Sequence, residues 1–566
     1  MKLVVVGGVA GGASVAARVR RLQEKAEIII FERGQHVSYS NCALPYYLSG
    51  AVEEEEDLVL MTPEDFRDQH NIDVRVCSEV TAIDRQAKTV TVKNRCTGEE
   101  YQESYDKLVL SPGAAPILPR SIAGVDRENV FIIRNVTDIA KVKACMDRAA
   151  TENVVVVGGG FIGIETAENL KAAGKNVAVI EGMSQILAPF DHDMVQYLQK
   201  ELMDNGVALY LDSTLTAIEE GQVRAVHNGE EFTVPADAVV MAIGVAPETA
   251  LVTAAGLEVG ATRGIKVNRH FQTADPDIYA VGDAIESFNA LTGQNGRLAL
   301  AGPAQRQARI AANHICGENE EDPGFIGSSC IRVFSLNAAS TGLNERAAKA
   351  AGIAYESVLV YPNDKVGIMP ESNYLGFKLL FAVPSGKLLG AQAIGVGEAD
   401  KRVNMIAALL TMNGTVADLK RLEHCYAPLF STAKDVVQMA ALVAENLLVG
   451  RLSQVHVNEV RSLVESGAYV VDVRDEDEFE EGHIIGAHNV PLPQLRQRMD
   501  EIPRDVPVYL HCRSSHRSYY AYRTLVGNGY DNVTNISGSF LGLSLYEYFT
   551  DKQTGRKPIV TEYNFE

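Results

Sequence analysis

The run Val154-Val155-Val156-Val157-Gly158-Gly159-Gly160-Phe161-Ile162-Gly163 decides the fold expected for the centre of this chain. An apolar strand leads directly into a G-x-G-x-x-G turn, a helix pattern continues to about Ala173, and the next strand, Asn176–Ile180, ends at Glu181. Such glycines let the backbone approach a pyrophosphate, the helix N-terminus adds partial positive charge, and the acid can accept a hydrogen bond from a ribose hydroxyl. Strand, glycines, helix and acid follow the order that the motif requires, which predicts a dinucleotide-binding unit.

The acid also indicates which dinucleotide binds. A carboxylate at Glu181, with no arginine directly after it, would repel a 2′-phosphate and therefore favours NADH. The alternative is a tight strand–helix turn that binds no ligand. The predicted NADH contacts in this unit are Gly158, Gly160, Phe161, Ile162, Gly163 and Glu181.

A second βαβ pattern opens the chain. Strand Lys2–Val6 runs into Gly7-Gly8-Val9-Ala10-Gly11-Gly12, a helix follows to about Gln23, and strand Glu27–Phe31 ends at Glu32. This copy is less regular, because Val9 stands where the fingerprint has its middle glycine. Two dinucleotide sites in one chain suggest that hydride passes from one cofactor to another. The predicted contacts of this unit are Gly7, Gly8, Ala10, Gly11, Gly12 and Glu32.

Composition limits the classes of protein that need to be considered. At 566 residues the chain should hold three or four domains, and 46% hydrophobic with 22% charged residues is ordinary for a globular protein. A formal charge of −21 argues against a general partner of nucleic acid or of an anionic membrane. The eight cysteines show no C-x-x-C pair and no metal-ligand spacing, so we expect no metal and a reducing, cytoplasmic location.

Three further segments carry a resemblance to a known family. They are Tyr105–Gly113, Met241–Pro247 and the strand that delivers Gly282-Asp283 to a loop, where the carboxylate can bond a ribityl hydroxyl. To about residue 445 the chain resembles the flavoprotein disulfide reductases that have two dinucleotide domains. The resemblance implies an FAD domain at 1–115 and 248–325, an NADH domain at 116–247, and an α+β interface domain at 326–445 that forms a homodimer. It adds Gly113, Gly282 and Asp283 as FAD contacts and Gly244 as an NADH contact.

Cys42 is the predicted redox thiol. No second cysteine lies within a turn or two, so the thiol needs an outside partner and would form a mixed disulfide, a persulfide or a sulfenic acid. The segment Ser38–Tyr46 resembles the single-cysteine branch, which contains coenzyme A-disulfide reductases, NADH oxidases and NADH peroxidases. A helix N-terminus and an electron-poor flavin are expected to lower the pKa of this thiol.

The same resemblance implies a coenzyme A site. Arg18 and Arg21 lie three residues apart on one helix face, with Ser14 one turn earlier, and offer an acidic protein a local positive patch. The resemblance assigns coenzyme A contacts to Ser14, Arg18, Arg21, Ser38, Asn41 and Lys434. It also implies that Tyr426 reaches the flavin and thiol of the partner subunit, whereas the family's second tyrosine is replaced near Ile368-Met369.

A different pattern follows residue 455. Helix Val457–Glu465 and strand Tyr469–Val473 precede strand Val508–His511, which feeds Cys512-Arg513-Ser514-Ser515-His516-Arg517 and another helix. Backbone N–H groups of this loop, with Arg513 and Arg517, can stabilise a thiolate and then a persulfide at Cys512. The segment 455–550 resembles a single rhodanese domain, followed by a tail at 551–566; Ser515 stands where many rhodaneses have glycine.

These features predict an α/β protein with two Rossmann-like domains for FAD and NADH, an α+β interface domain and a C-terminal α/β rhodanese domain. The expected activity is NADH-dependent reduction of persulfides or polysulfides, including coenzyme A persulfide and coenzyme A disulfide, with release of hydrosulfide. Cys42 would carry the reduction and Cys512 would accept sulfane sulfur. The alternatives are an NADH oxidase or peroxidase that uses a Cys42 sulfenic acid, and a flavin-binding redox sensor with a docking rhodanese domain.

Overall fold

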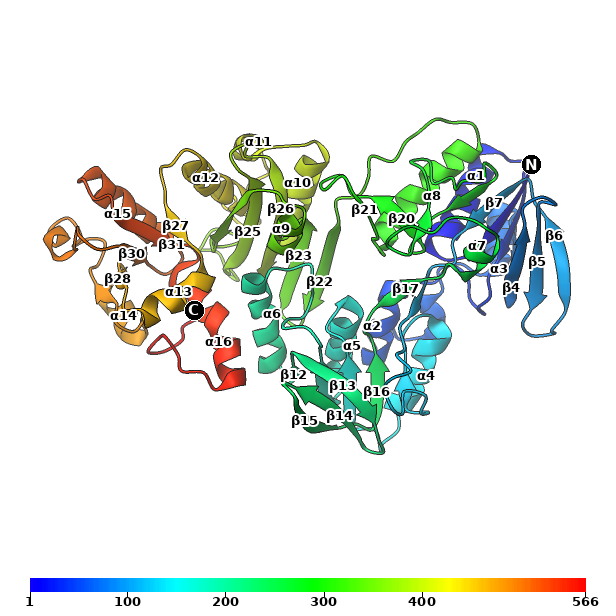
Figure 1. Ribbon diagram of the computed structural model, residues 1–566, viewed down its shortest axis with the longest axis horizontal. Coiled ribbons are helices and arrows are strands. Elements are labelled where there is room, and N and C mark those ends of the chain that lie inside the picture. Colours follow the sequence, from blue (N-terminus) through cyan, green and yellow to red (C-terminus); the bar gives the residue numbers. More distant parts are fainter. Residues whose placement is uncertain (566) are drawn as a thin grey trace. The chain divides into compact units, whose positions relative to one another are not determined.

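The computed structural model describes residues 1–565, which form two compact units (Figure 1). The first unit consists of Met1–Ser184 and Val207–Phe325. The second consists of Gln185–Gly206 and the chain from Ile326 on. A segment of the expected NADH domain therefore packs with the C-terminal half of the chain. The expected domain limits stay a prediction.

The first sheet of the first unit is the expected FAD-binding sheet. It is parallel, with the order β19-β7-β1-β2-β3 and the bounds Ile278–Ala280, Lys107–Leu110, Lys2–Val6, Glu27–Phe31 and Asp73–Arg75. Helix α1, Ala10–Leu22, follows the glycine turn and packs against α8, Ala301–Ile315 (Figure 1). Strands β1, β2, β7 and β19 are buried over most of their length, as near-continuous apolar runs predict for parallel sheets, whereas the edge strand β3 is partly exposed.

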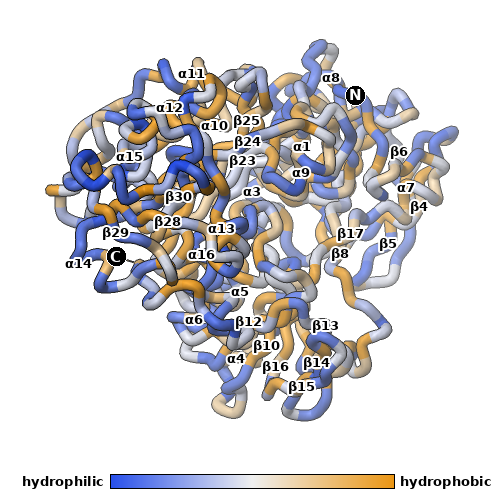
Figure 2. Tube along the Cα trace, turned by 60° about the vertical axis from the view of Figure 1, so that its left-hand side comes forward, coloured by the Kyte–Doolittle hydropathy of each residue, from blue (hydrophilic) through white to orange (hydrophobic). Residues whose placement is uncertain are grey.

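The second sheet repeats this plan. Its order is β12-β11-β10-β16-β9, with the bounds Ala208–Tyr210, Asn176–Ile180, Asn153–Val157, Ala238–Met241 and Val130–Phe131. Helix α5, Phe161–Ala172, begins at the glycine turn, and α4, Val136–Met146, lies near β9. Along the trace, β10 and β16 are hydrophobic, which accounts for their burial at the centre of the sheet (Figure 2).

Smaller elements complete the first unit. Of the two segments that resemble the family's crossovers, Tyr105–Gly113 leads into β8, Ala114–Pro116, and Met241–Pro247 ends in β17, Val245–Pro247. The two strands pair antiparallel. A short helix α2, Leu44–Ser49, packs against α5. The remaining strands are β4 Ser78–Asp84, β5 Thr89–Asn94, β6 Glu100–Ser104, β13 Ser213–Ile218, β14 Gln222–His227, β15 Glu230–Pro235, β18 Ile265–Lys266, β20 Ile285–Phe288 and β21 Asn295–Gly296. The remaining helices are α3 Pro63–His70 and α7 Ala250–Ala254, with 3₁₀ turns η1 Asn41–Ala43 and η2 Glu55–Leu58.

The second unit contains an antiparallel sheet in the order β22-β23-β26-β25-β24. The bounds are Ser328–Val333, Leu336–Gly342, Leu388–Gly395, Leu375–Ala382 and Tyr355–Val360. Its helices are α6 His192–Asp204, α9 Glu345–Ala350, α10 Ala399–Thr411, α11 Val416–Arg421 and α12 Val436–Leu448. Buried Lys378 ties α6 to this sheet, because its Nζ lies 2.7 Å from both Asp193 and Glu345 and 3.3 Å from Asp191.

The C-terminal part of the second unit is built on a parallel sheet in the order β27-β31-β30-β28-β29. The bounds are Gln454–Val455, Val533–Ile536, Val508–His511, Tyr469–Asp472 and His488–Asn489. Its helices are α13 Val457–Glu465, α14 Glu476–Glu481, α15 His516–Gly527 and α16 Ser539–Thr554, with the 3₁₀ turn η3 Met499–Glu501. After α16 the tail returns to this domain, where Val560 forms a β-bridge with Ile484.

The structure confirms the elements expected around both glycine turns and around Cys512, with ends shifted by no more than a few residues. The helix of the first turn starts earlier than expected, at Ala10, and the helix after Cys512 ends at Gly527. Within residues 1–565, none of the helices combines the length and the apolar character needed to cross a bilayer.

Candidate active sites

The first glycine turn fits a bound FAD. Gly7 has φ +94°, and a Cβ there would lie 2.1 Å from Ser111 O; at Gly12 it would lie 1.9 Å from Gly7 O. The turn therefore has no room for side chains, which lets a pyrophosphate approach its backbone closely. The Glu32 carboxylate is held in place because it accepts hydrogen bonds from Gly8 N at 2.9 Å and Gly34 N at 2.8 Å.

The flavin end of this site has its own signature. Burial alone raises the pKa of the Asp283 carboxyl, and within the described residues no hydrogen bond satisfies that side chain. The backbone next to it is fixed, because Gly282 N donates a hydrogen bond to Gln307 Oε1 at 2.8 Å. An unsatisfied half-buried carboxylate at a strand end suits a polyol hydroxyl donor.

The second turn repeats the geometry of the first. Gly158 has φ +110°, and a Cβ on Gly163 would lie 1.9 Å from Gly158 O. The Glu181 carboxylate accepts from Gly159 N at 2.5 Å and Met183 N at 2.8 Å. Glu181 and Glu32 thus accept equivalent backbone hydrogen bonds at their glycine turns, which fits the ribose-binding role predicted for both. The other predicted glycine contacts, Gly113 and Gly244, have φ +73° and +117°.

Cys42 is exposed on η1, directly before α2. Its pKa is raised, first by burial of the sulfur and then by the carboxylates of Glu165 and Asp283. Burial and these two carboxylates therefore shift the pKa of the thiol in the direction opposite to the one expected. The lowering expected from a bound flavin stays a prediction. The structure does bring Cys42 and the predicted flavin contact Asp283 together.

Glu165 is a functional candidate that the motif reading missed. It lies on α5, two residues after the last glycine of the NADH turn, and burial followed by the charge of Glu168 raises its pKa to about 7. Tyr46, from the Cys42 segment, hydrogen-bonds to it and opposes that rise. A carboxyl that titrates near neutral pH beside a redox thiol can hold or release a proton there. The available signal in the sequence was a glutamate in the first turns of the helix that follows the NADH glycines.

The predicted coenzyme A residues of α1 do not all behave alike. Ser14 Oγ lies 2.7 Å from Gln305 Oε1, and Arg18 Nε donates to Asn313 Oδ1 at 2.9 Å, so both face α8. Arg21 is exposed, and its Nε donates to Ala17 O of its own helix at 3.2 Å. Ser38 has φ +49°, and exposed Asn41 donates weakly to Arg134 O at 3.4 Å. Their coenzyme A role stays a prediction.

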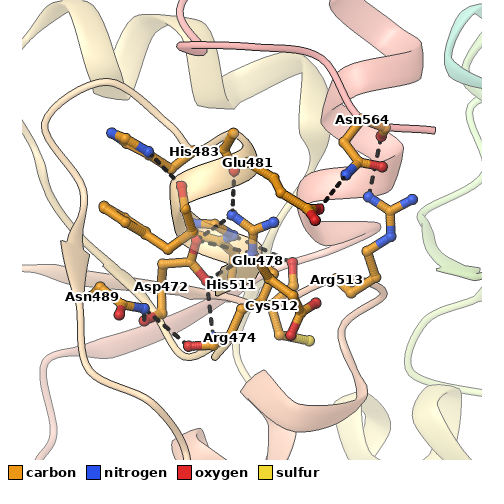
Figure 3. Close-up of polar contacts among 12 residues, drawn as sticks. Asp472, Arg474, Glu478, Glu481, His483, Asn489, His511, Cys512, Arg513 and Asn564 are labelled. Atoms are coloured by element: carbon orange, nitrogen blue, oxygen red, sulfur yellow. Dashed lines mark hydrogen bonds and ion pairs between the residues drawn. The ribbon is translucent and has the colours of Figure 1, made fainter. Parts of the chain in front are cut away.

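In the second unit, the Cys512 loop connects β30 to α15 as expected. Cys512 is only 1% exposed, and its N–H donates to Ser539 Oγ at 3.2 Å. Beneath the loop, buried Asp472 accepts from Arg474, with contacts of 2.6 and 3.0 Å, and lies 3.6 Å from His511 (Figure 3). Burial alone would raise the pKa of Asp472, but His511 and Arg474 hold it below its usual value. This anchored network keeps the loop in place.

Ser515 shows why glycine is common at this position in rhodaneses. Its φ is +71°, a left-handed conformation that costs roughly 1 kcal/mol for a residue with a side chain. The Ser515 hydroxyl offsets this strain, since it lies 3.0 Å from Ile536 O and 3.1 Å from Ser539 Oγ. A serine is thus accommodated without changing the turn.

The two loop arginines point to different partners. Arg517 pairs with Glu478 at 2.5 and 2.7 Å; this contact, which outweighs burial, and the nearby Cys512 sulfur raise its pKa. Arg513 is directed toward the C-terminal tail and donates to Asn564 O at 3.1 Å (Figure 3). Of the two loop arginines, Arg517 is therefore the one whose charge interacts with the Cys512 sulfur. The role of Arg513 stays a prediction.

The second unit also brings a predicted coenzyme A contact to this loop. Burial and then the Lys434 ammonium lower the pKa of His516, the first residue of α15. Lys434 and the loop that starts at Cys512 are therefore neighbours. Close by in sequence, Tyr426, Leu429 and Phe430 are 49%, 62% and 60% exposed, an unusual concentration of apolar surface. Within residues 1–565, no three side chains of His, Cys, Asp or Glu are grouped as a metal site.

Comparison with known families agrees with this geometry. Residues 1–308 match the model of the pyridine nucleotide-disulphide oxidoreductases, and residues 329–437 match the dimerisation domain of that group. Residues 456–545 match the rhodanese-like domain. These matches confirm the expected fold class.

Individual proteins resemble larger parts of the chain. Coenzyme A disulfide reductase of Staphylococcus aureus is 32% identical over 451 residues, which are 78% of this chain and all of the relative. The crystal structure of reduced CoADR-RHD from Bacillus anthracis has 42% identity and a TM-score of 0.93, and the match covers 97% of this chain and 98% of that one. A NAD-dependent persulfide reductase from A. fulgidus has 34% identity and a TM-score of 0.90, with 95% and 99% coverage.

Proposed function

The chain belongs to the pyridine nucleotide-disulphide oxidoreductase family, and from that premise we propose that it reduces persulfides and polysulfides with NADH and releases hydrosulfide. FAD and NAD(H) are the cofactors of this family. The proposal extends to coenzyme A persulfide and coenzyme A disulfide as substrates, because relatives that match 78% and 95% of the chain are a coenzyme A disulfide reductase and a persulfide reductase.

The observation that carries the proposal is the pair of different thiol sites in one chain. Cys42 is a single exposed thiol beside Asp283 in the FAD-binding unit, whereas Cys512 lies in a rhodanese loop beside Arg517. A protein that only reduced disulfides would need no sulfur-accepting loop. The two sites together suit a substrate in which one sulfur is transferred and one sulfur–sulfur bond is reduced.

The chain's own residues account for the sulfur chemistry. At Cys512, a thiolate attacks the terminal sulfur of R–S–SH, which gives a Cys512 persulfide and the thiol RSH; Arg517 stabilises the anion. At Cys42, a thiolate attacks the inner sulfur of a persulfide, which forms a mixed disulfide and expels hydrosulfide. Glu165 is placed to take up or supply a proton there. Bound FAD and NADH supply hydride acceptance and the two electrons that cleave a sulfur–sulfur bond.

We also propose that the protein works as a homodimer in the cytoplasm. Support comes from the match to the dimerisation domain and from the exposed Tyr426, Leu429 and Phe430, which a second copy would cover. In that dimer, Tyr426 would reach the partner's flavin, and Lys434 would contact coenzyme A bound near Ser14, Arg18, Arg21, Ser38 and Asn41.

The test is the yield of hydrosulfide per NADH with coenzyme A persulfide and with inorganic polysulfide. We expect one hydrosulfide per NADH with the persulfide, loss of turnover in Cys42→Ser, and a selective loss of polysulfide turnover in Cys512→Ser. Cys330→Ser, which removes an exposed thiol on β22, is the control and should behave as the wild type. NADH consumption on oxygen without hydrosulfide would instead establish the oxidase alternative.

A further inference from the structure

Two cysteines outside both active sites are brought together in the FAD-binding unit. Cys77 precedes β4, and Cys96 lies in the turn between β5 and β6. Cys77 is partly exposed and Cys96 is exposed, and the Cys96 thiol raises the pKa of Cys77. Nineteen positions of sequence separate them, so no cysteine motif marks the pair.

The backbone explains how the two thiols meet. Strands β4 and β5 pair antiparallel, with Ser78 opposite Asn94, and Arg95 N donates to Cys77 O at 2.7 Å. Cys96 therefore lies one residue beyond the residue that faces Cys77. In a regular ladder such diagonal neighbours point to opposite faces, but Cys77 has φ +51°, and Asn94 Oδ1 accepts from Cys96 N at 2.9 Å in a tight turn. These two departures bring the side chains to the same side.

The position of Cys77 is firmly held. Its N–H donates to Gly34 O at 2.8 Å, and the next residue, Ser78, donates to Glu32 O at 2.9 Å. A non-glycine residue in the left-handed region is strained and is maintained only because its surroundings determine it. Arg95, which pairs with Cys77 through the 2.7 Å hydrogen bond from Arg95 N to Cys77 O, directly precedes Cys96. The backbone therefore places the two cysteines at adjoining positions of neighbouring strands, the arrangement in which a disulfide, which bridges Cα atoms about 4.4 to 6.8 Å apart, can form.

We propose that Cys77 and Cys96 form a second sulfane-sulfur-reactive site, a dithiol that persulfides or polysulfides oxidise to an intramolecular disulfide. The oxidant is the substrate class of the proposed function, on which this inference rests. Exposed Cys96 is the attacking thiol. Cys77, whose pKa is raised first by its interaction with Cys96 and then by burial, acts as the resolving thiol.

The reaction balances in two steps. The Cys96 thiolate attacks the terminal sulfur of R–S–SH, which gives Cys96–S–SH and RSH after proton uptake. The Cys77 thiolate then attacks the Cys96 sulfur, forms the Cys77–Cys96 disulfide and expels hydrosulfide. In total, two thiols and one persulfide give one disulfide, one RSH and one H₂S. The dithiol loses two electrons and the sulfane sulfur gains them, so NADH is not required.

The experiment uses the FAD-loaded protein with Cys42→Ser and Cys512→Ser, so that neither proposed turnover thiol can contribute. This protein is treated with inorganic polysulfide without NADH, desalted, alkylated and analysed by intact mass and peptide mapping. We expect the loss of two alkylatable thiols, a peptide that links Cys77 to Cys96, and one equivalent of hydrosulfide released by this pair. The matched control adds Cys96→Ser and should keep Cys77 alkylatable, while the exposed, separate Cys425 stays alkylatable in both.

Two results would overturn the inference: full alkylation of Cys77 and Cys96 after polysulfide, or a linked peptide that joins either cysteine to a different one. Failure of the proposed function is measured separately, as absent NADH-dependent hydrosulfide release by the wild type. A Cys77–Cys96 disulfide in a protein without that turnover would refute the proposed function alone.

Discussion

Replacement of Glu165 by glutamine should make the Cys42 thiol more reactive above neutral pH. The substitution keeps an acceptor for Tyr46 but removes a charge that raises the pKa of Cys42. Because the pKa of Glu165 is about 7, its carboxyl is mostly neutral at pH 6 and mostly ionised at pH 8. The wild type and the variant should therefore react alike at pH 6 and diverge as the pH rises through 7.

The size of the effect follows from Coulomb's law. Two unit charges about 10 Å apart at an effective dielectric of about 20 interact by about 1.7 kcal/mol, or a little over 1 pKa unit. Cys42 is exposed, so solvent screening reduces this value. We expect Cys42 in the Glu165→Gln protein to be alkylated about three to ten times faster than in the wild type at pH 8.

The assay is the rate of Cys42 alkylation by iodoacetamide in the FAD-loaded protein between pH 6 and 9, followed by peptide mass. Glu168→Gln provides a second test with the opposite sign. The charge of Glu168 raises the pKa of Glu165, so its removal should ionise Glu165 at lower pH and slow alkylation near pH 7. Equal rates for Glu165→Gln and the wild type at pH 8 would show that Glu165 does not act on Cys42.

Three substitutions, each with a comparison variant, test other parts of the structure. Gly12→Ala would place a Cβ 1.9 Å from Gly7 O and should abolish flavin binding, measured as bound FAD per chain. In the control Gly527→Ala the new Cβ meets no atom within 4 Å, and this protein should retain FAD. Ser515→Ala keeps the left-handed strain but loses two hydroxyl contacts, so calorimetry should show the rhodanese domain destabilised by about 1 to 2 kcal/mol. Ser515→Gly relieves the strain and should destabilise the domain less; the reverse order would contradict the strain argument. Lys378→Met leaves three carboxylates without their buried cation and should destabilise the second unit by about 3 to 5 kcal/mol. Lys401→Met, at the surface, should change the free energy of unfolding by less than about 1 kcal/mol. Equal losses of stability in the two variants would refute the buried-charge interpretation.

Much of the fold could be predicted because its signals are local. Apolar runs such as Lys2–Val6, glycine turns and a terminal acid specify a βαβ unit within about 30 residues, and the structure contains both expected copies. The sequence pattern also located the Cys512 loop between β30 and α15. It did not predict that Gln185–Gly206 packs with the C-terminal half, because a surface helix can bury its apolar face against any element that the fold presents.

The candidate sites divide in the same way. The amino-acid sequence by itself determined two dinucleotide turns, one lone thiol at Cys42 and one rhodanese loop, because each depends on neighbours within a few positions. Only the tertiary structure decided that Glu165 raises the pKa of Cys42, that Lys434 lies beside the Cys512 loop, and that Cys77 meets Cys96. Contacts between residues far apart in the chain depend on how strands register and helices pack, and no local pattern of side chains encodes that arrangement.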